Sequence, residues 1–166
     1  VLPESSNVNV TLDQTVLQND KDYSFTGSDN VNAGTATLTV KGSGNYSGTL
    51  TQTYTIGSLS ITNASVNPSA DATGLVIRYQ DTYSRTGSAI VPDVKITNTV
   101  GTNTVTLYDS TDADKKNNAT VSASSNTNSG KARVTISGCN NLTGSVSGNF
   151  TISNRTFDDL SVTVGN

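Results

Sequence analysis

Three aspartates in the second half of the chain are the first residues whose spacing could do chemistry. Asp109, Asp112 and Asp114 lie on one polar stretch, and carboxylate oxygens are the ligands that Ca²⁺ prefers. Their spacing differs from that of an EF-hand loop, and two lysines follow them directly. The stretch therefore has two interpretations, a calcium site and a solvated loop, and the sequence favours the loop. Asp20 and Asp22 repeat the pattern more weakly.

The tyrosines offer a second kind of chemistry, because flat aromatic faces can stack on sugar rings. The chain has six tyrosines and no tryptophan. Tyr23 and Tyr54 alternate with polar residues and are expected in a core. Tyr79, Tyr83 and Tyr108 are expected to be the most exposed and are the candidate ligand-binding residues. Their alternative role is to anchor the edge of a β-sandwich, since a tyrosine carries both a large apolar ring and a polar hydroxyl.

The composition excludes most catalytic chemistry. The 166 residues contain no histidine and one cysteine, which rules out a Ser-His-Asp triad, a histidine-ligated metal and an intrachain disulfide. The formal net charge of −3 argues against nucleic acid as a partner, because binding a phosphate backbone requires a basic surface. No apolar run approaches the length of a membrane span. Composition leaves catalysis by carboxylates alone, as in glycosidases, open. An active site on a duplicated small module runs against the repeat described below, so we expect a protein that is not an enzyme and needs no cofactor, with Ca²⁺ as the one ion considered.

The elements that must position these residues are β-strands. Apolar residues alternate with Thr, Lys and Arg at a period of two, which is the pattern of a half-buried strand. The clearest examples are Ala36, Leu38 and Val40, and Ala132, Val134 and Ile136. Turn-forming Gly, Ser and Asn residues separate these stretches from the strands that follow them. No strong helical stretch interrupts the pattern, so we predict an all-β fold of antiparallel modules.

The chain also repeats itself. Residues 32–56 and 128–152 align without a gap at a spacing of 96, and nine of the 25 pairs are identical, including three glycines. Beyond each stretch a similar segment recurs, Leu-Ser-Ile-Thr at residues 59–62 and Leu-Ser-Val-Thr at residues 160–163. The repeat predicts two modules, residues 1–67 and residues 68–166, with the first shorter at its N-terminus.

Two stretches carry a resemblance to a known family. Residues 83–94, which begin Tyr-Ser-Arg-Thr-Gly, are similar to the opening of a repeat found in large bacterial surface proteins. Residues 30–49, which include Asn-Ala-Gly-Thr-Ala-Thr-Leu-Thr-Val-Lys-Gly, are similar to its close. The chain thus resembles the bacterial Ig-like surface repeats of Gram-positive multidomain adhesins, which open on Tyr-Thr-Gly and close on an NAGTATVTITGKGNYTGT-type motif. The second copy departs from the pattern at Leu142, where the first copy has Tyr46.

The resemblance implies tandem Ig-like β-sandwich modules on the outside of a bacterial cell, with β-grasp-like modules as the alternative. It implies a spacer or stalk that presents neighbouring domains of the same polypeptide. The alternative function is an adhesive module for a polysaccharide or a host surface protein, with its site on the loops of the second copy. The single Cys139 aligns with Ser43 of the first copy, so we expect the fold not to depend on its thiol.

Overall fold

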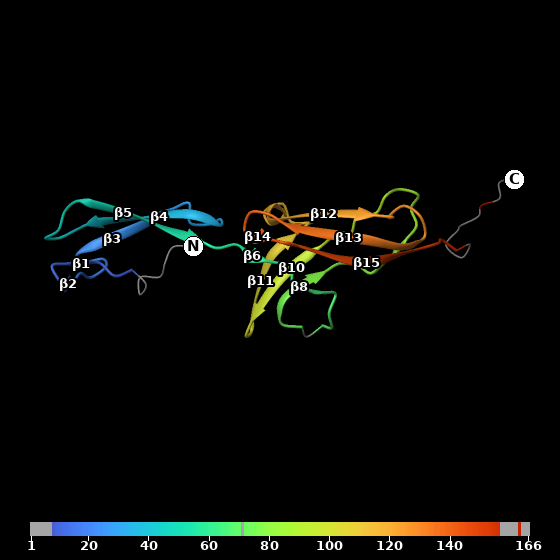
Figure 1. Ribbon diagram of the computed structural model, residues 1–166, viewed down its shortest axis with the longest axis horizontal. Helices are drawn as coiled ribbons and strands as arrows, with labels where there is room; N and C mark the ends of the chain where they lie inside the picture. The colour runs from blue at the N-terminus through green and yellow to red at the C-terminus, as the bar shows by residue number, and fades with distance from the viewer. Residues whose placement is uncertain (1–7, 71, 157–162, 164–166) are drawn as a thin grey trace. The chain divides into compact units, whose positions relative to one another are not determined.

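The computed structural model describes residues 8–70, 72–156 and 163. The chain divides into two compact units, the first ending at Ser58 and the second beginning at Leu59 (Figure 1). Among the described residues every regular element is a β-strand, except for one short 3₁₀ turn at Lys116–Asn118. The prediction of an all-β fold is confirmed, and most of the strand pairs are antiparallel.

The first unit is a single sheet with a small hairpin beside it. The sheet has the strand order β3-β4-β5, and the hairpin consists of β1 and β2. Their bounds are Thr11–Leu12 (β1), Thr15–Val16 (β2), Tyr23–Ser28 (β3), Gly34–Gly42 (β4) and Thr49–Ile56 (β5). Tyr23 and Ala36 are buried, while Tyr54 is only half-buried. The prediction that Tyr23 lies in a core is confirmed, whereas Tyr54 is less buried than predicted.

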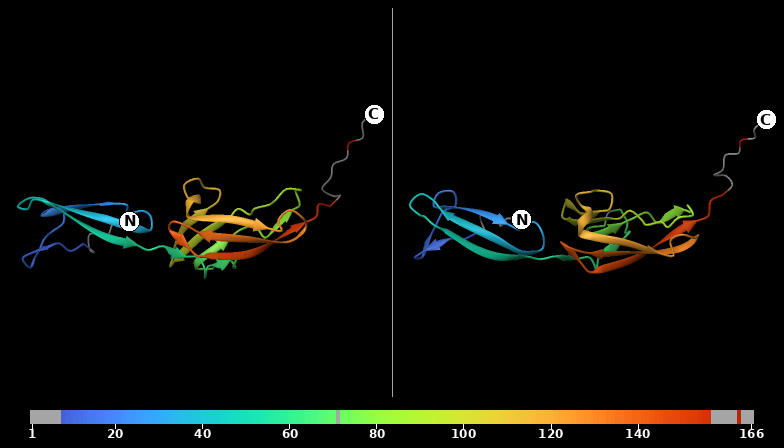
Figure 2. Two further views of the ribbon diagram at one scale, coloured as in Figure 1. Left: turned by 45° about the horizontal axis from the view of Figure 1, so that its top comes forward. Right: turned by 90° about the horizontal axis from the view of Figure 1, so that it is seen from above.

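The second unit has two four-stranded sheets (Figure 2). One has the order β11-β10-β8-β7 and the other β12-β13-β15-β9, and two short strands, β14 and β6, form a separate pair. The bounds in the first sheet are Ser65–Val66 (β7), Gly74–Arg78 (β8), Lys95–Val100 (β10) and Asn103–Asp109 (β11). In the second sheet and the pair they are Thr82–Ser84 (β9), Ala119–Ser124 (β12), Gly130–Gly138 (β13), Ser145–Ser153 (β15), Leu142–Thr143 (β14) and Leu59–Ser60 (β6).

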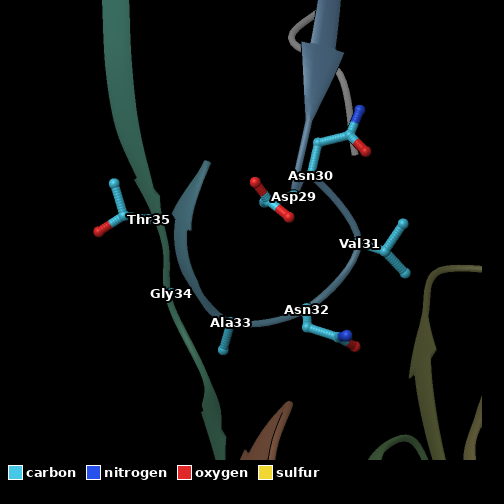
Figure 3. A pocket seen from close by; sticks show the side chains of 7 residues that line it. All are labelled: Asp29, Asn30, Val31, Asn32, Ala33, Gly34 and Thr35. Atoms are coloured by element: carbon cyan, nitrogen blue, oxygen red, sulfur yellow. The ribbon is translucent and has the colours of Figure 1, made fainter. Parts of the chain in front are cut away.

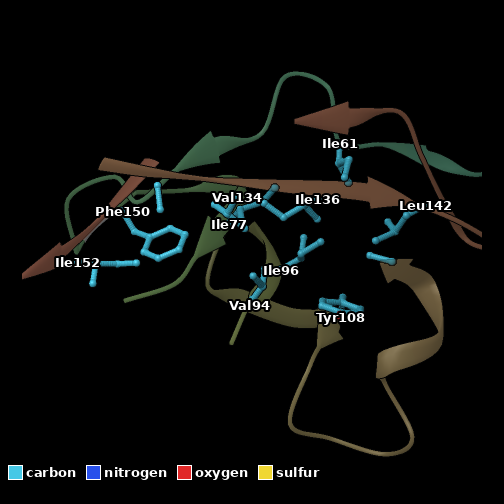
Figure 4. Packing of buried hydrophobic residues seen from close by; sticks show 12 residues of the cluster. Ile61, Ile77, Val94, Ile96, Tyr108, Val134, Ile136, Leu142, Phe150 and Ile152 are labelled. Carbon is cyan, nitrogen blue, oxygen red and sulfur yellow. The ribbon is translucent and has the colours of Figure 1, made fainter. Parts of the chain in front are cut away.

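The core of the second unit draws on both sheets. Ile77 and Ile96 from the first sheet and Val134, Ile136 and Phe150 from the second belong to one buried cluster (Figure 4). The alternation seen in the sequence explains this arrangement, because every second residue of β13 points to the same face of its sheet. Burial of such side chains is the main favourable term in folding. The second unit therefore has the two-layer architecture of a β-sandwich.

The boundary between the units lies earlier in the chain than the repeat predicted. Leu59 and Ser60 pair in parallel with β14 of the second unit. Ile61, next along the chain, is fully buried in the core of that unit. β7 then pairs in parallel with β8. The segment from residue 59 to residue 66, which the predicted boundary after residue 67 places in the first module, therefore belongs to the second unit.

The repeat in sequence is also a repeat in backbone geometry. In both units the connection from the long central strand to the next strand is closed by three hydrogen bonds of 2.9 to 3.1 Å, displaced by 96 residues. They run from Gly42 to Gly48, Tyr46 to Ser43 and Ser43 to Asp22, and from Gly138 to Gly144, Leu142 to Cys139 and Cys139 to Asn118. Each connection begins with a glycine because a side chain at that position would clash with the backbone of the connection. A Cβ at Gly138 would lie 2.8 Å from the backbone carbon of Leu142, closer than packing allows.

Corresponding apolar residues of the two long sheets are buried to different degrees in the two units. Val40 and Leu50 of the first unit correspond to Ile136 and Val146 of the second. Ile136 is fully buried and Val146 packs against the core, whereas Val40 is half-buried and Leu50 is 64% exposed. The reason is that no second four-stranded sheet faces β3-β4-β5 among the described residues.

Candidate functional site

The acidic loop after β11 keeps its carboxylates in separate turns. Asp109 Oδ1 accepts hydrogen bonds from the Thr111 amide at 3.0 Å and the Thr111 hydroxyl at 2.7 Å. Asp112 Oδ1 accepts one from the Asp114 amide at 3.0 Å. Such turns are what short acidic side chains form with their own backbone. In the described part of the chain no group of three or more acidic or cysteine residues is placed to hold a metal ion. The candidate calcium ligands Asp109, Asp112 and Asp114 are therefore not brought together.

Neighbouring side chains stabilise the same loop from within. Lys95 Nζ lies 3.4 Å from Asp109 Oδ2, and Lys115 Nζ lies 3.9 Å from Asp112 Oδ2. Asn118 Nδ2 donates a hydrogen bond of 3.0 Å to a backbone carbonyl of β11. The polar side chains of the loop after β11, which the first copy lacks, therefore make their contacts within that loop and with the strands next to it.

Asp109→Asn is expected to lower the free energy of unfolding at pH 7, and the loss should shrink below about pH 4. The Thr111 hydroxyl and amide, and then Lys95, hold the pKa of the Asp109 carboxyl below its usual value. Because the pKa is lower in the folded state, the stabilisation is present above the unfolded-state pKa and disappears as the pH falls through the folded-state value. Urea unfolding at pH 7 and pH 3 measures the difference. Asp114→Asn is the control, and an equal loss at both pH values would contradict this origin.

The three tyrosines proposed as ligand-binding residues do not form one exposed surface. Tyr108 is only 4% exposed and belongs to the core cluster. The expectation that Tyr108 is exposed is therefore wrong. Its place on β11, directly opposite the buried Ile96 of β10, turns the ring inward. Tyr79 and Tyr83 are half-buried and pack against the same cluster.

Tyr79 and Tyr83 make contacts within the second unit. The Tyr79 hydroxyl donates a hydrogen bond to the backbone carbonyl of Asn149 at 3.3 Å. The Tyr83 ring meets Phe150 edge to face, with ring centroids 5.5 Å apart and an interplanar angle of 77°, a favoured aromatic geometry. Burial raises the pKa of both phenols, and the negative charge of Asp81 adds to the shift. Both residues therefore act as anchors of the sandwich edge.

The loop between β3 and β4 surrounds a hollow of about 530 Å³. Figure 3 shows Asp29 projecting into this loop, while Val31 points away from it. The second unit has a similar hollow between β12 and β13. Asp29 and its counterpart Ser125 both have φ of 53°, and Gly34 and Gly130 have φ of 138° and 131°. The hollow is therefore a product of the repeated turn, and its lining residues differ between the units.

A more apolar cavity lies in the first unit, between the β1–β2 hairpin and the sheet. This cavity of about 340 Å³, here called the hairpin cavity, is lined by side chains from both sides. Val10, Leu12 and Leu17 contribute from the hairpin and the residues next to it, Leu50 from β5, and Tyr46 from the connection between β4 and β5. Leu12 is 52% exposed, so apolar surface at this place is incompletely covered. Isolated apolar residues on a surface are ordinary, but a contiguous group usually marks an interaction site.

The repeat contains a signal for the unit boundary, the Leu-Ser-Ile-Thr segment at residues 59–62. A boundary after residue 67 places this segment at the end of the first module. The structure places it at the start of the second unit, beside β14. Residues 46–48 of the first unit, which correspond to β14 and the glycine after it, line the hairpin cavity.

Comparisons with known proteins do not assign the chain to a family. No protein-family model matches the chain, and no curated protein or solved structure matches it. Within residues 8–70, 72–156 and 163, none of the structure is a helix with the length and apolar character that a membrane crossing demands. The candidate sites are therefore judged by their geometry.

Proposed function

We propose that the chain is a non-catalytic pair of modules of a bacterial cell-surface protein, acting outside the cell as a spacer that presents neighbouring domains. The observation that carries this proposal is the recurrence of one sheet and one strand connection in both units, with the same three backbone hydrogen bonds at a spacing of 96. Repeated modules extend a chain by addition of like units, and each contacts only its neighbours. The resemblance to Ig-like surface repeats points in the same direction.

The composition of the surface supports a role in a variable medium. Only 14% of the residues are charged, and threonines alternate with other residues along β4 and β5, where β-branching suits the pleat. Few charges are present for salt to screen, and no histidine is present to titrate between about pH 5 and 8. Among the described residues the core contains no buried polar or charged side chain.

The alternative role is adhesion to a glycan or a host protein through the loops of the second copy. The acidic loop directs its polar groups to its own backbone and to Lys95 and Lys115. The buried Tyr108 is not available to a ligand. These observations favour the spacer, and the experiment below tests both roles.

The test joins the chain between a cell-wall anchor and a reporter epitope on a bacterial surface. We expect antibody access to the epitope to fall when the 166 residues are deleted and to return when an unrelated pair of Ig-like modules replaces them. The isolated chain is screened in parallel on a glycan array, with and without Ca²⁺, and is expected to bind nothing. Glycan binding that is lost in Tyr79→Ala or Tyr83→Ala, but not in Tyr46→Ala, would overturn the spacer in favour of adhesion.

A further inference from the structure

The chain enters the second unit through β6, which is held both by its backbone and by one buried side chain. The Leu59 amide donates a hydrogen bond of 2.9 Å to the Asn141 carbonyl, and the Ile61 amide donates one of 2.8 Å to the Thr143 carbonyl. The Ile61 side chain is fully buried and belongs to the core cluster (Figure 4). The entry strand of the unit is therefore fixed to the β14 region by hydrogen bonds and to the core by a side chain.

The chain leaves the same unit through β15, which is an interior strand. β15 lies between β13 and β9 in its sheet. Near its end, the Thr151 amide donates a hydrogen bond of 2.8 Å to the Asp81 carbonyl, and the Ser153 carbonyl accepts one of 2.9 Å from the Arg85 amide. A strand with a neighbour on each side does not form an edge from which it could be peeled. A pull on the end of β15 must therefore slide it along both neighbours.

β14 connects the entry strand with the exit strand. It runs parallel to β6, and a single residue, Gly144, separates it from β15. The Gly138 amide donates a hydrogen bond of 2.9 Å to the Gly144 carbonyl, which extends the β13–β15 ladder beyond the pair of Ser137 with Ser145. Tension between the ends of the unit therefore pulls on the N-terminal end of β6 and, through β15, on the C-terminal end of β14.

The parallel direction of the two strands decides how this tension acts on them. Because β6 and β14 run the same way, pulls on their opposite ends are directed along the strands and away from each other, which loads the pair in shear. In shear, the two hydrogen bonds and the packing of Ile61 must fail together. If both strands were instead pulled from the same end, the hydrogen bonds would break one after the other, and each contributes little by itself.

We infer that β6, together with Ile61, is a latch that lets the second unit resist tension between its two ends. The resistance depends on direction. It is high when the unit is pulled through its entry and exit strands, and it is low when β6 and β14 are peeled apart from one end. This property belongs to the fold of the second unit and holds whether or not the chain acts as a spacer. In a spacer, the latch keeps the length of the unit constant while the neighbouring domains are pulled.

Single-molecule pulling on the full-length chain tests the latch. Azido side chains at Ser58 and Asn154, two exposed positions directly outside β6 and β15, attach the handles that load the latch in shear. In a second chain the handles are attached at Ser58 and Asn140, which is exposed and precedes β14, so that the same pair is peeled. At one constant force, we expect the time before the first release of length to be at least about tenfold longer in shear, because more interactions must break at once and forced opening follows the unfolding rate.

Two alanine variants and a measurement without load complete the test. Under shear, Ile61→Ala should shorten the time before release at least about tenfold through the loss of its burial, whereas Leu59→Ala, at a position 40% exposed, should change it little. Each time is compared with the unloaded unfolding rate of the same chain in urea, so that only the effect of direction remains. Equal times in the two directions, or an Ile61→Ala chain that lasts as long as the wild type under shear, would show that β6 is not a latch.

Discussion

A chain that begins at residue 68 is expected to lose most of the stability of the second unit, while one that begins at residue 59 keeps it. The shorter chain lacks β6, β7 and the fully buried Ile61. Removal of a buried isoleucine costs about 2–5 kcal/mol through lost burial and the cavity that remains. A domain is typically stable by only about 5–15 kcal/mol. Urea unfolding followed by far-UV circular dichroism should therefore show a large fall in the midpoint for residues 68–166.

Point variants in the complete chain separate the role of the segment from the effect of truncation. Ile61→Ala should lower the free energy of unfolding of the second unit by about 2–5 kcal/mol. Leu59→Ala removes a side chain that is 40% exposed and should cost clearly less. Equal midpoints for residues 68–166 and residues 59–166, or equal effects of the two alanines, would show that the segment is not part of the second unit.

The strands could be predicted from the sequence because their chemistry is local. In residues 34–42 and 130–138 the alternation of apolar and polar side chains has the period of a strand, and the structure has β4 and β13 at those residues. The turns after them follow from Gly, Asn and Ser. The buried position of Tyr23 followed from the same alternation.

The module boundary could not be predicted, because a repeat determines a spacing and not the point where a unit begins. The segment at residues 59–62 has the same spacing to its neighbours whichever unit it joins. Its place is decided by the hydrogen bonds that Leu59 and Ile61 make with the β14 region and by the space for Ile61 in the core. The hydrogen bonds join residues about 80 positions apart in the chain, so no local pattern contains them.

The burial of Tyr108 was missed for a related reason. Alternation along β11 separates two faces, but it does not say which face the second sheet covers. The pairing register of β10 and β11 shifts between Ile96 and Thr97, which leaves Leu107 without a partner in β10. Leu107 and Tyr108 both pack on the core cluster, so the period of two breaks at this point of the strand. The pairing of Tyr108 with Ile96 and the packing of the two sheets turn the tyrosine inward.

Tyr108→Ala is expected to lower the free energy of unfolding of the second unit by about 3–5 kcal/mol, the usual cost of truncating a large buried ring. Tyr108→Phe keeps the ring and should stay close to wild type at pH 7. Tyr46→Ala, at a half-buried position of the first unit, should leave the second unit unchanged. Urea unfolding of the full chain, with the second unit followed by its own transition, measures all three.

The difference in unfolding free energy between the wild type and Tyr108→Phe should also depend on pH, which it would not do for a tyrosine exposed at the surface. Burial, and then the negative charges of Cys139, Asp109 and Asp93, raise the pKa of the Tyr108 phenol. Because the folded-state pKa is the higher one, the neutral phenol contributes fully below the unfolded-state value near 10 and its contribution is lost as the pH rises above it. The free energy of unfolding should thus fall more steeply above about pH 10 in the wild type than in Tyr108→Phe. If the free energy of unfolding falls equally steeply with pH in the wild type and in Tyr108→Phe, and Tyr108→Ala is as stable as the wild type, then the ring is exposed. A sugar-binding surface that includes Tyr108 would in that case become the better interpretation.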